Sequence, residues 1–116
     1  MFAVENLTQK TFLGHVTQAR SLKSRMIGLL AHTSLEPGTG LWISPCSSIH
    51  TFFMRFSIDV VFISSTYTIL KTYEDLKPFR LSAWVTKAAG VLELPSGTLA
   101  QTRSLPSHQL SIRRVA

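Results

Sequence analysis

The stretch that decides the fold is IHTFFMRFSIDVVFI, which runs from Ile49 to Ile63. It is rich in β-branched and aromatic residues, which favour strands, and yet it contains two charges, Arg55 and Asp59. Around the start of the strand, one parity holds the apolar Phe56, Ile58, Val60 and Phe62 and the other holds the polar Arg55, Ser57 and Asp59. This predicts one core face and an opposite face whose first residues are polar. Because an unpaired charge in a core costs several kcal/mol, we expect each charge to be paired, at a rim or facing a site.

Further strands are predicted on both sides of this stretch. The small polar residues from Ser64 to Thr66 indicate a hairpin turn. Gly14 is expected to mark a bulge or a close backbone approach, and Pro78 indicates a loop or an edge position. The predicted strands are Thr11 to Gln18, Leu41 to Ile43, Phe56 to Ile63, Tyr67 to Tyr73, Gly90 to Pro95 and Gln109 to Arg113.

One main helix is predicted from Ser21 to about Ala31, because leucine and methionine recur there at helical spacing and Ser21 can cap it. A short helix is predicted from Ser96 to about Arg103. Many short strands with one good helix predict an α+β, mainly antiparallel β fold, a small partly closed sheet or barrel with one main helix and one or two short helices. We expect residues 1–116 to form a single domain.

The composition favours a packed globule over disorder, since 45% of the residues are hydrophobic and 9% are aromatic. The single cysteine, Cys46, excludes an internal disulfide. The segment from Met1 to Lys10 lacks a cationic region followed by an apolar core, and the apolar runs are too short to span a bilayer. We therefore expect a soluble, unprocessed, cytoplasmic protein with no membrane span.

The net charge of +6 could attract phosphate backbones, but the cations are scattered along the chain. They form loose groups at residues 20–25, 77–87 and 113–114. Aromatic and basic residues do not interleave as in an RNA-binding sheet, and recognition-helix and zinc-finger spacings are missing. Solvated surface charge is the ordinary interpretation, and a basic nucleic-acid-binding protein is kept as a second alternative.

No metal site or cofactor is predicted. The four histidines, His15, His32, His50 and His108, are isolated and show none of the paired spacings of zinc ligands. The segment from Gly38 to Gly40 lacks the Gly-Lys-Ser/Thr that follows in a phosphate-binding loop.

Three segments together resemble a known family. They are RMIGLL at residues 25–30, CSSIHTFFMRFSIDVVFI at residues 46–63 and VLELPSG at residues 91–97. Their order is similar to that of the domain of unknown function 192 family, which has an arginine and Gly-Leu-Met in a helix, an aromatic-Met-basic cluster, an aliphatic residue before aspartate, a Phe-Ile/Leu strand and Leu-Glu-Leu-Pro-x-Gly. The matching positions are Arg25, Gly28, Leu29, His50, Phe53, Met54, Arg55, Asp59, Phe62, Glu93 and Gly97.

The resemblance covers roughly residues 19–112 and implies a compact, mostly β domain without an established activity. Two places depart from the family pattern. Leu30 stands where methionine is usual, and Leu105 to Gln109 replaces the usual glycine-aspartate turn before the last strand. The resemblance therefore implies no site that depends on this turn.

The main site hypothesis is a charged cluster of Arg25, Arg55, Asp59 and Glu93, in which two cations and two carboxylates from separate apolar elements neutralise one another. In one interpretation the cluster is a partly buried ion-pair network that fixes strand register. In the other it borders a groove for a peptide, a glycan or a small anion. The candidate walls of this groove are Trp42, Phe53, Met54 and Trp84.

A rival hypothesis is a thiol site, since Cys46, His50 and Asp59 are the residue types of a nucleophile, its base and an orienting carboxylate. In an extended chain Cys46 and His50 would be about 13 Å apart, so contact between them requires a bend. An inert cysteine and a histidine bonded to backbone are the more usual case. We therefore predict a binding or accessory module for a peptide, glycan or another protein, with a thiol-dependent or hydrolytic enzyme as the first alternative.

Overall fold

The structure is a computed structural model that describes residues 1–19, 35–52 and 54–115. Within these residues, seven strands form one sheet and one short helix packs against it. The elements are β1 (Phe2–Asn6), β2 (Thr11–Ala19), β3 (Thr39–Ile43), β4 (Ile58–Ile63), β5 (Ile69–Leu76), β6 (Gly90–Pro95), α2 (Thr98–Thr102) and β7 (Leu110–Arg114). The helix predicted from Ser21 to about Ala31 lies outside the described residues.

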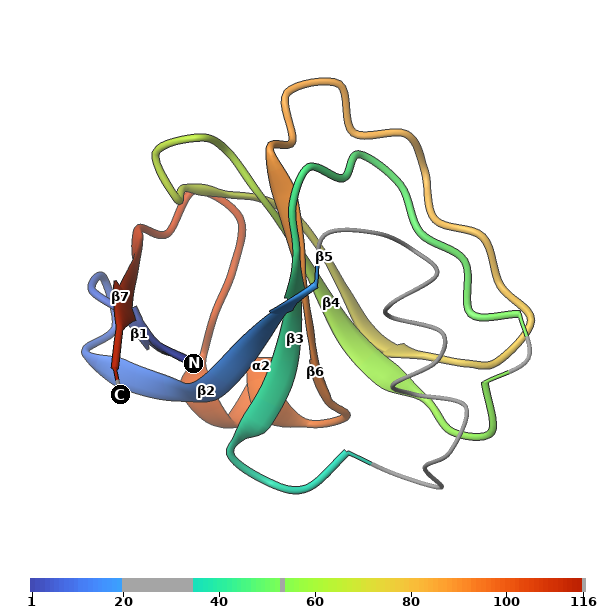
Figure 1. The fold of residues 1–116 in the computed structure, drawn as a ribbon, viewed down its shortest axis with the longest axis horizontal. Coiled ribbons are helices and arrows are strands. Elements are labelled where there is room, and N and C mark those ends of the chain that lie inside the picture. Colours follow the sequence, from blue (N-terminus) through green and yellow to red (C-terminus); the bar gives the residue numbers. More distant parts are fainter. Residues whose placement is uncertain (20–34, 53, 116) are drawn as a thin grey trace.

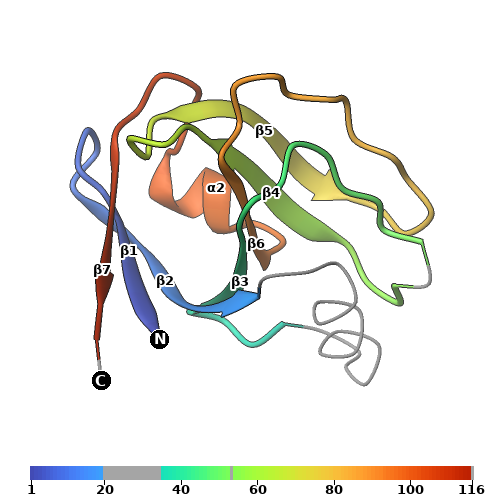
Figure 2. The ribbon, with the colours of Figure 1, turned by 45° about the horizontal axis from the view of Figure 1, so that its top comes forward.

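The sheet has the strand order β5-β4-β6-β3-β2-β1-β7 and is curled into a half-barrel (Figure 1). Only β2 and β3 pair in parallel among the described strands; the other neighbours are antiparallel. The two ends of the sheet approach each other, because the backbone N–H of Leu110 donates to the carbonyl of Tyr67 at 2.9 Å and that of Ile69 to the carbonyl of His108 at 2.9 Å. The helix α2 lies within the curl, on the face of the sheet that we call the inner face (Figure 2).

The prediction of a partly closed, mainly antiparallel sheet is confirmed, and the fold is mostly β. The α+β class and a second short helix are not confirmed by the described residues, which contain α2 alone as a helix. The predicted strands have counterparts in β2 to β7, although β5 begins at Ile69 and extends to Leu76. β1 has no counterpart among the predicted strands, since its buried residues Ala3, Val4 and Asn6 do not alternate in the manner of a one-sided strand.

Strand β4 is buried on both faces, so the face that begins with the polar Asp59 is also a core face. Its odd-numbered members Val61 and Ile63 belong to the inner core, which surrounds α2, and Val60 and Phe62 belong to a second core on the opposite, outer face. The outer core is covered by residues 44–57 and 77–89, which we call the paired loops. They contribute Ile49, Met54 and Val85, among others, to this core.

Gly14 meets both expectations. It lies at φ +137° opposite an irregularity in the register of β1, where the pairing shifts between Val4 and Glu5. A Cβ atom at this position would lie 2.9 Å from the carbonyl oxygen of Gly38, so a side chain would separate β2 from the segment that leads into β3.

Candidate functional site

Asp59 lies on the inner face of β4 and is fully buried, with 0% of its surface exposed. Its Oδ2 accepts hydrogen bonds from the backbone N–H groups of Gly97 at 3.1 Å and Leu99 at 2.8 Å. Its Oδ1 accepts from the backbone N–H of Asp75 at 2.8 Å. Both carboxylate oxygens are therefore engaged by backbone amides rather than by a cation.

This arrangement gives α2 the cap that its own sequence lacks. The N-cap residue of α2 is Gly97, which has no side chain to accept the free N–H groups of the first turn. Asp59 reaches these groups because it pairs with Leu94, close to the end of the neighbouring strand β6. Asp59 consequently ties β4, the β6–α2 junction and β5 together.

Asp75 adds a second, exposed contact to the same junction. Its carboxylate accepts from the Ser96 hydroxyl at 2.7 Å and from the Lys77 ammonium at 3.0 Å. The Ser96 hydrogen bond, followed by that of Lys77 and its positive charge, holds the pKa of Asp75 below its usual value.

The structure places the two carboxylates of the predicted charged cluster on opposite faces of the sheet. Glu93 is buried like Asp59, but it has the parity of Val91 on β6 and so lies on the outer face, beside Val60 and Leu41 of the neighbouring strands. Asp59 lies on the opposite side of the sheet, and Arg55 is exposed in the loop before β4. Side chains alternate between the two faces along each strand. The two carboxylates therefore lie on opposite faces, although their residues are neighbours in the sheet. Arg25 lies outside the described residues.

The thiol triad is also not assembled, because the Asp59 carboxylate is engaged on the inner face. Cys46 packs against the outer core and its Sγ donates to the carbonyl of Ser48 at 3.1 Å. His50 lies over the ring of Phe52, with centroids 5.0 Å apart and an interplanar angle of 27°. In the described part of the chain, Asp59 therefore bonds to backbone N–H groups and not to His50. Over the described ranges, no group of three His, Cys, Asp or Glu side chains could hold a metal ion.

The predicted groove walls do not face one another. Trp42 belongs to the inner core, and Met54 belongs to the outer core. Trp84 is 72% exposed on the paired loops. Phe53 lies outside the described residues.

The paired loops are joined by backbone hydrogen bonds along their length. The N–H of Thr51 donates to the carbonyl of Arg80 at 2.9 Å, that of Ser82 to Ile49 at 2.9 Å, and that of Val85 to Ser47 at 2.8 Å. These bonds make an irregular antiparallel ribbon, with a bridge between His50 and Leu81. Figure 2 shows the two loops running side by side at the end of the sheet away from β7.

Buried hydroxyl groups fix the shape of this ribbon. Thr51 is fully buried; its Oγ1 donates to the carbonyl of Lys77 at 2.6 Å and accepts from the N–H of Arg80 at 2.8 Å. Ser82 Oγ accepts from the N–H of Ile49 at 2.9 Å, and the hydroxyl of Tyr73 accepts from the N–H of Ala83 at 2.8 Å.

Four large apolar side chains of the paired loops are exposed. Phe52 is 41% exposed, Phe79 62%, Leu81 70% and Trp84 72%. The same two loops carry four exposed cations, Arg55, Lys77, Arg80 and Lys87, and neither range contains an Asp or a Glu. We call these eight side chains the loop surface. The sequence patterns missed it because its members come from two segments that meet only in the folded chain.

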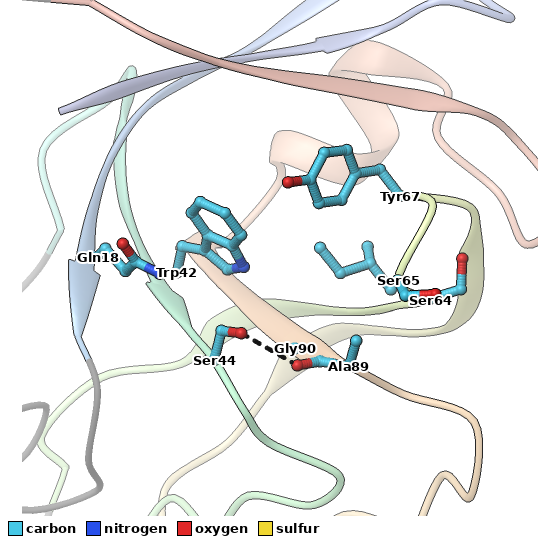
Figure 3. A pocket seen from close by; sticks show the side chains of 9 residues that line it. Gln18, Trp42, Ser44, Ser64, Ser65, Tyr67, Ala89 and Gly90 are labelled. Atoms are coloured by element: carbon cyan, nitrogen blue, oxygen red, sulfur yellow. Dashed lines mark hydrogen bonds between the residues drawn. The ribbon is translucent and has the colours of Figure 1, made fainter.

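A cavity of about 310 Å³ lies beside Trp42, at the edge where the turn after β4 faces the start of β6 (Figure 3). A smaller cavity of about 170 Å³ lies at the other end of these strands, beside α2. No helix in the described parts of the chain is long and apolar enough to cross a membrane.

The fold and these surfaces define a small half-barrel domain with a short internal helix and an elaborated pair of loops. The chain belongs to the family called domain of unknown function 192 (DUF192, uncharacterized ACR), whose model matches residues 4–112. This match confirms the resemblance seen in the sequence. No curated protein is significantly similar to the chain.

Two solved structures are similar to this one. One is a Sinorhizobium meliloti 1021 protein whose name proposes a transcription regulator, with 21% identity over 96% of this chain and 91% of that chain and a TM-score of 0.75. The other is a Novosphingobium aromaticivorans DSM 12444 protein of unknown function, with 16% identity over 95% of this chain and 82% of that chain and a TM-score of 0.77. At these identities the similarity shows the fold alone.

Proposed function

We propose that this chain is a binding module that docks an acidic segment of a partner protein on the loop surface. One observation carries the proposal: two loops paired by backbone hydrogen bonds present exposed aromatic and aliphatic side chains together with cations, and the loops contain no acidic residue. Of the four cations, Lys77 pairs with Asp75 just outside the loops at 3.0 Å.

The charge distribution supports an acidic partner. The chain has 12 Lys and Arg residues and 6 Asp and Glu residues, and all of the acidic residues lie outside the paired loops. A surface of one sign attracts a segment of the opposite sign, speeds its association and rejects partners of like charge. Binding should therefore weaken as the salt concentration rises.

The apolar side chains supply the anchors. Exposed large apolar side chains that gather on one surface are typical of interaction sites, and tryptophan and arginine are enriched among the residues that dominate binding energy. Trp84 and Leu81 are the most exposed large apolar residues of the described chain. Burying them against a partner would remove apolar surface from water, which the free domain leaves hydrated.

The loop surface is also preorganised. Phe79 holds a left-handed backbone conformation, with φ +61°, and its N–H donates to the carbonyl of Thr51 at 3.0 Å. Such a conformation costs an aromatic residue about 1 to 3 kcal/mol, and it persists because the bonds around Thr51 specify it. A surface that is already ordered has less conformational entropy to lose on binding.

A protein segment fits this surface better than a nucleic acid. Single-stranded nucleic acids need open aromatic faces on which bases stack. One face of Phe52 lies against His50, at a centroid distance of 5.0 Å, and Leu81 offers no stacking face, so that only Phe79 and Trp84 of the four apolar side chains present open rings. An aliphatic anchor beside aromatic ones is instead suited to apolar side chains within an acidic peptide.

The test uses labelled synthetic peptides in which glutamate alternates with leucine, phenylalanine or tryptophan, with fluorescence anisotropy as the readout. We expect micromolar binding that weakens with salt. The double variant Leu81→Ser/Trp84→Ser should lose about tenfold or more in affinity, because both anchors are removed.

The matched control is Phe12→Ser/Leu105→Ser, which removes two exposed apolar side chains elsewhere, 49% and 57% exposed, and should leave affinity unchanged. Equal losses in both double variants would contradict the proposal. So would the absence of binding to every acidic peptide, or a preference for a single-stranded oligonucleotide of the same charge.

A further inference from the structure

The cavity beside Trp42 has the features of a small-ligand site that is separate from the loop surface. It is bordered by the ends of β2 and β3, the turn after β4 and the start of β6. Its volume of about 310 Å³ is at the lower end of the range for ligand pockets, so it suits a molecule of one ring. The principal side chains around it are Gln18, Trp42, Ser44, Ser65 and Tyr67 (Figure 3).

The lining carries no formal charge. None of the nine lining residues is Asp, Glu, Lys, Arg or His, although the chain as a whole is strongly basic. An ionic ligand would therefore lose its hydration without gaining a counter-charge. The lining selects for a neutral molecule.

Several polar groups at the cavity have hydrogen-bonding capacity to spare. The indole Nε1–H of Trp42, the amide of Gln18 and the hydroxyls of Ser65 and Tyr67 form no hydrogen bond with any residue that the structure describes. Together they offer donors and acceptors around a common space. Ser44 Oγ donates to the carbonyl of Ala89 at 3.2 Å and retains its acceptor capacity.

The aromatic side of the cavity is held in place. Trp42 meets the edge of Tyr67 at a centroid distance of 5.9 Å and the ring of Phe2 at 5.1 Å, both near perpendicular. Tyr67 has the left-handed φ of +66°, and its N–H donates to the carbonyl of Ser64 at 3.0 Å. The turn between β4 and β5 therefore fixes the backbone of Tyr67 at the cavity.

Gly90 keeps the cavity open. A Cβ atom there would lie 3.0 Å from Trp42 Nε1 and 3.0 Å from the carbonyl oxygen of Ile43. A side chain at this position would press on the indole N–H, so glycine preserves both the space and the donor.

From these features we infer that the cavity binds a neutral polyhydroxylated ring of monosaccharide size. The partly exposed ring of Tyr67 can pack against the C–H face of a sugar, while the hydroxyl and amide groups and the indole N–H of Trp42 match its hydroxyls. This site lies apart from the loop surface and does not depend on the proposed protein partner.

The test uses the variant Trp84→Phe, which leaves Trp42 as the single tryptophan because the chain contains 2 tryptophans. Glucose, galactose, mannose and N-acetylglucosamine are titrated separately, with Trp42 fluorescence and two-dimensional amide NMR spectra as readouts. We expect at least one sugar to bind with a millimolar Kd, to change Trp42 fluorescence and to shift the amide signals of Ser65 and Gly90.

Gln18→Ala in the same background should reduce the affinity for that sugar about threefold to tenfold, which is the effect of one lost hydrogen bond. Gln101→Ala, an exposed glutamine on α2, is the matched control and should change nothing. The inference is overturned if no sugar perturbs Trp42, if the shifts map away from the cavity, or if the two glutamine variants behave alike in folded protein.

Discussion

Replacing Asp59 by alanine is expected to lower the free energy of unfolding by about 3 kcal/mol or more, because each buried donor left without an acceptor costs about 1 to 3 kcal/mol. The reason is that three backbone N–H groups, those of Asp75, Gly97 and Leu99, donate to this one carboxylate. Without it they are left unsatisfied beside the inner core. For a chain of this size the melting temperature should fall by roughly 10 °C or more, measured by thermal and urea unfolding.

Two further variants sharpen this prediction. Asp59→Asn keeps one acceptor oxygen but turns an N–H₂ donor toward backbone N–H groups, so it should be intermediate. Asp75→Asn is the control, because Asp75 is exposed and asparagine tolerates its left-handed φ of +52°. Its melting temperature should stay close to that of the natural chain. If the Asp59→Ala protein had the same melting temperature as the natural chain, the role of Asp59 as the cap of α2 would be refuted.

Gly40→Ala is expected to destabilise the sheet by about 3 kcal/mol or more, at or above the usual range for an overpacked core. A Cβ atom at Gly40 would lie 2.6 Å from the carbonyl oxygen of Glu93 and 2.8 Å from Leu94 Cδ2. The first of these is a backbone atom of β6, so β3 and β6 must move apart for the methyl group to fit. Urea unfolding measures the loss.

Gly38→Ala provides the comparison for this prediction. No atom lies within 4 Å of a Cβ built at Gly38, and its φ is +78°, so alanine there meets only the cost of the left-handed conformation. That cost is about 1 to 2 kcal/mol. If Gly38→Ala lowered the free energy of unfolding as much as Gly40→Ala or more, close packing between β3 and β6 would not be the reason for glycine at position 40.

The positions of most strands could be predicted from the sequence, because β-branched runs between turn residues are local signals. The burial of both faces of β4 could not, since the face that carries Asp59, Val61 and Ile63 is buried around α2, and α2 reaches it only through long-range contacts. Alternation along the strands also separates Asp59 from Glu93, which a comparison of side-chain types does not reveal.

Sequence-based prediction of the candidate site fails for a similar reason. The sequence identified Asp59 as a charge that needs compensation, which is correct, but it sought the compensation among cations. Backbone N–H groups at Gly97 and Leu99 provide it instead, and backbone groups do not appear in an inventory of side chains. The cations Lys77 and Arg80 are distant from Phe52 in the sequence, and they come close to it only because both pair with Thr51 in the folded chain.

The most direct test of the proposed function is a charge exchange across the loop surface. The double variant Arg80→Glu/Lys87→Glu is compared with Arg113→Glu/Arg114→Glu, which changes the net charge equally on β7. Binding of the glutamate peptides is measured beside binding of the same peptides with lysine in place of glutamate. We predict that only the loop variant loses affinity for the acidic peptides, by about tenfold, and gains affinity for the lysine peptides. Equal behaviour of the two variants would contradict recognition by the loop surface.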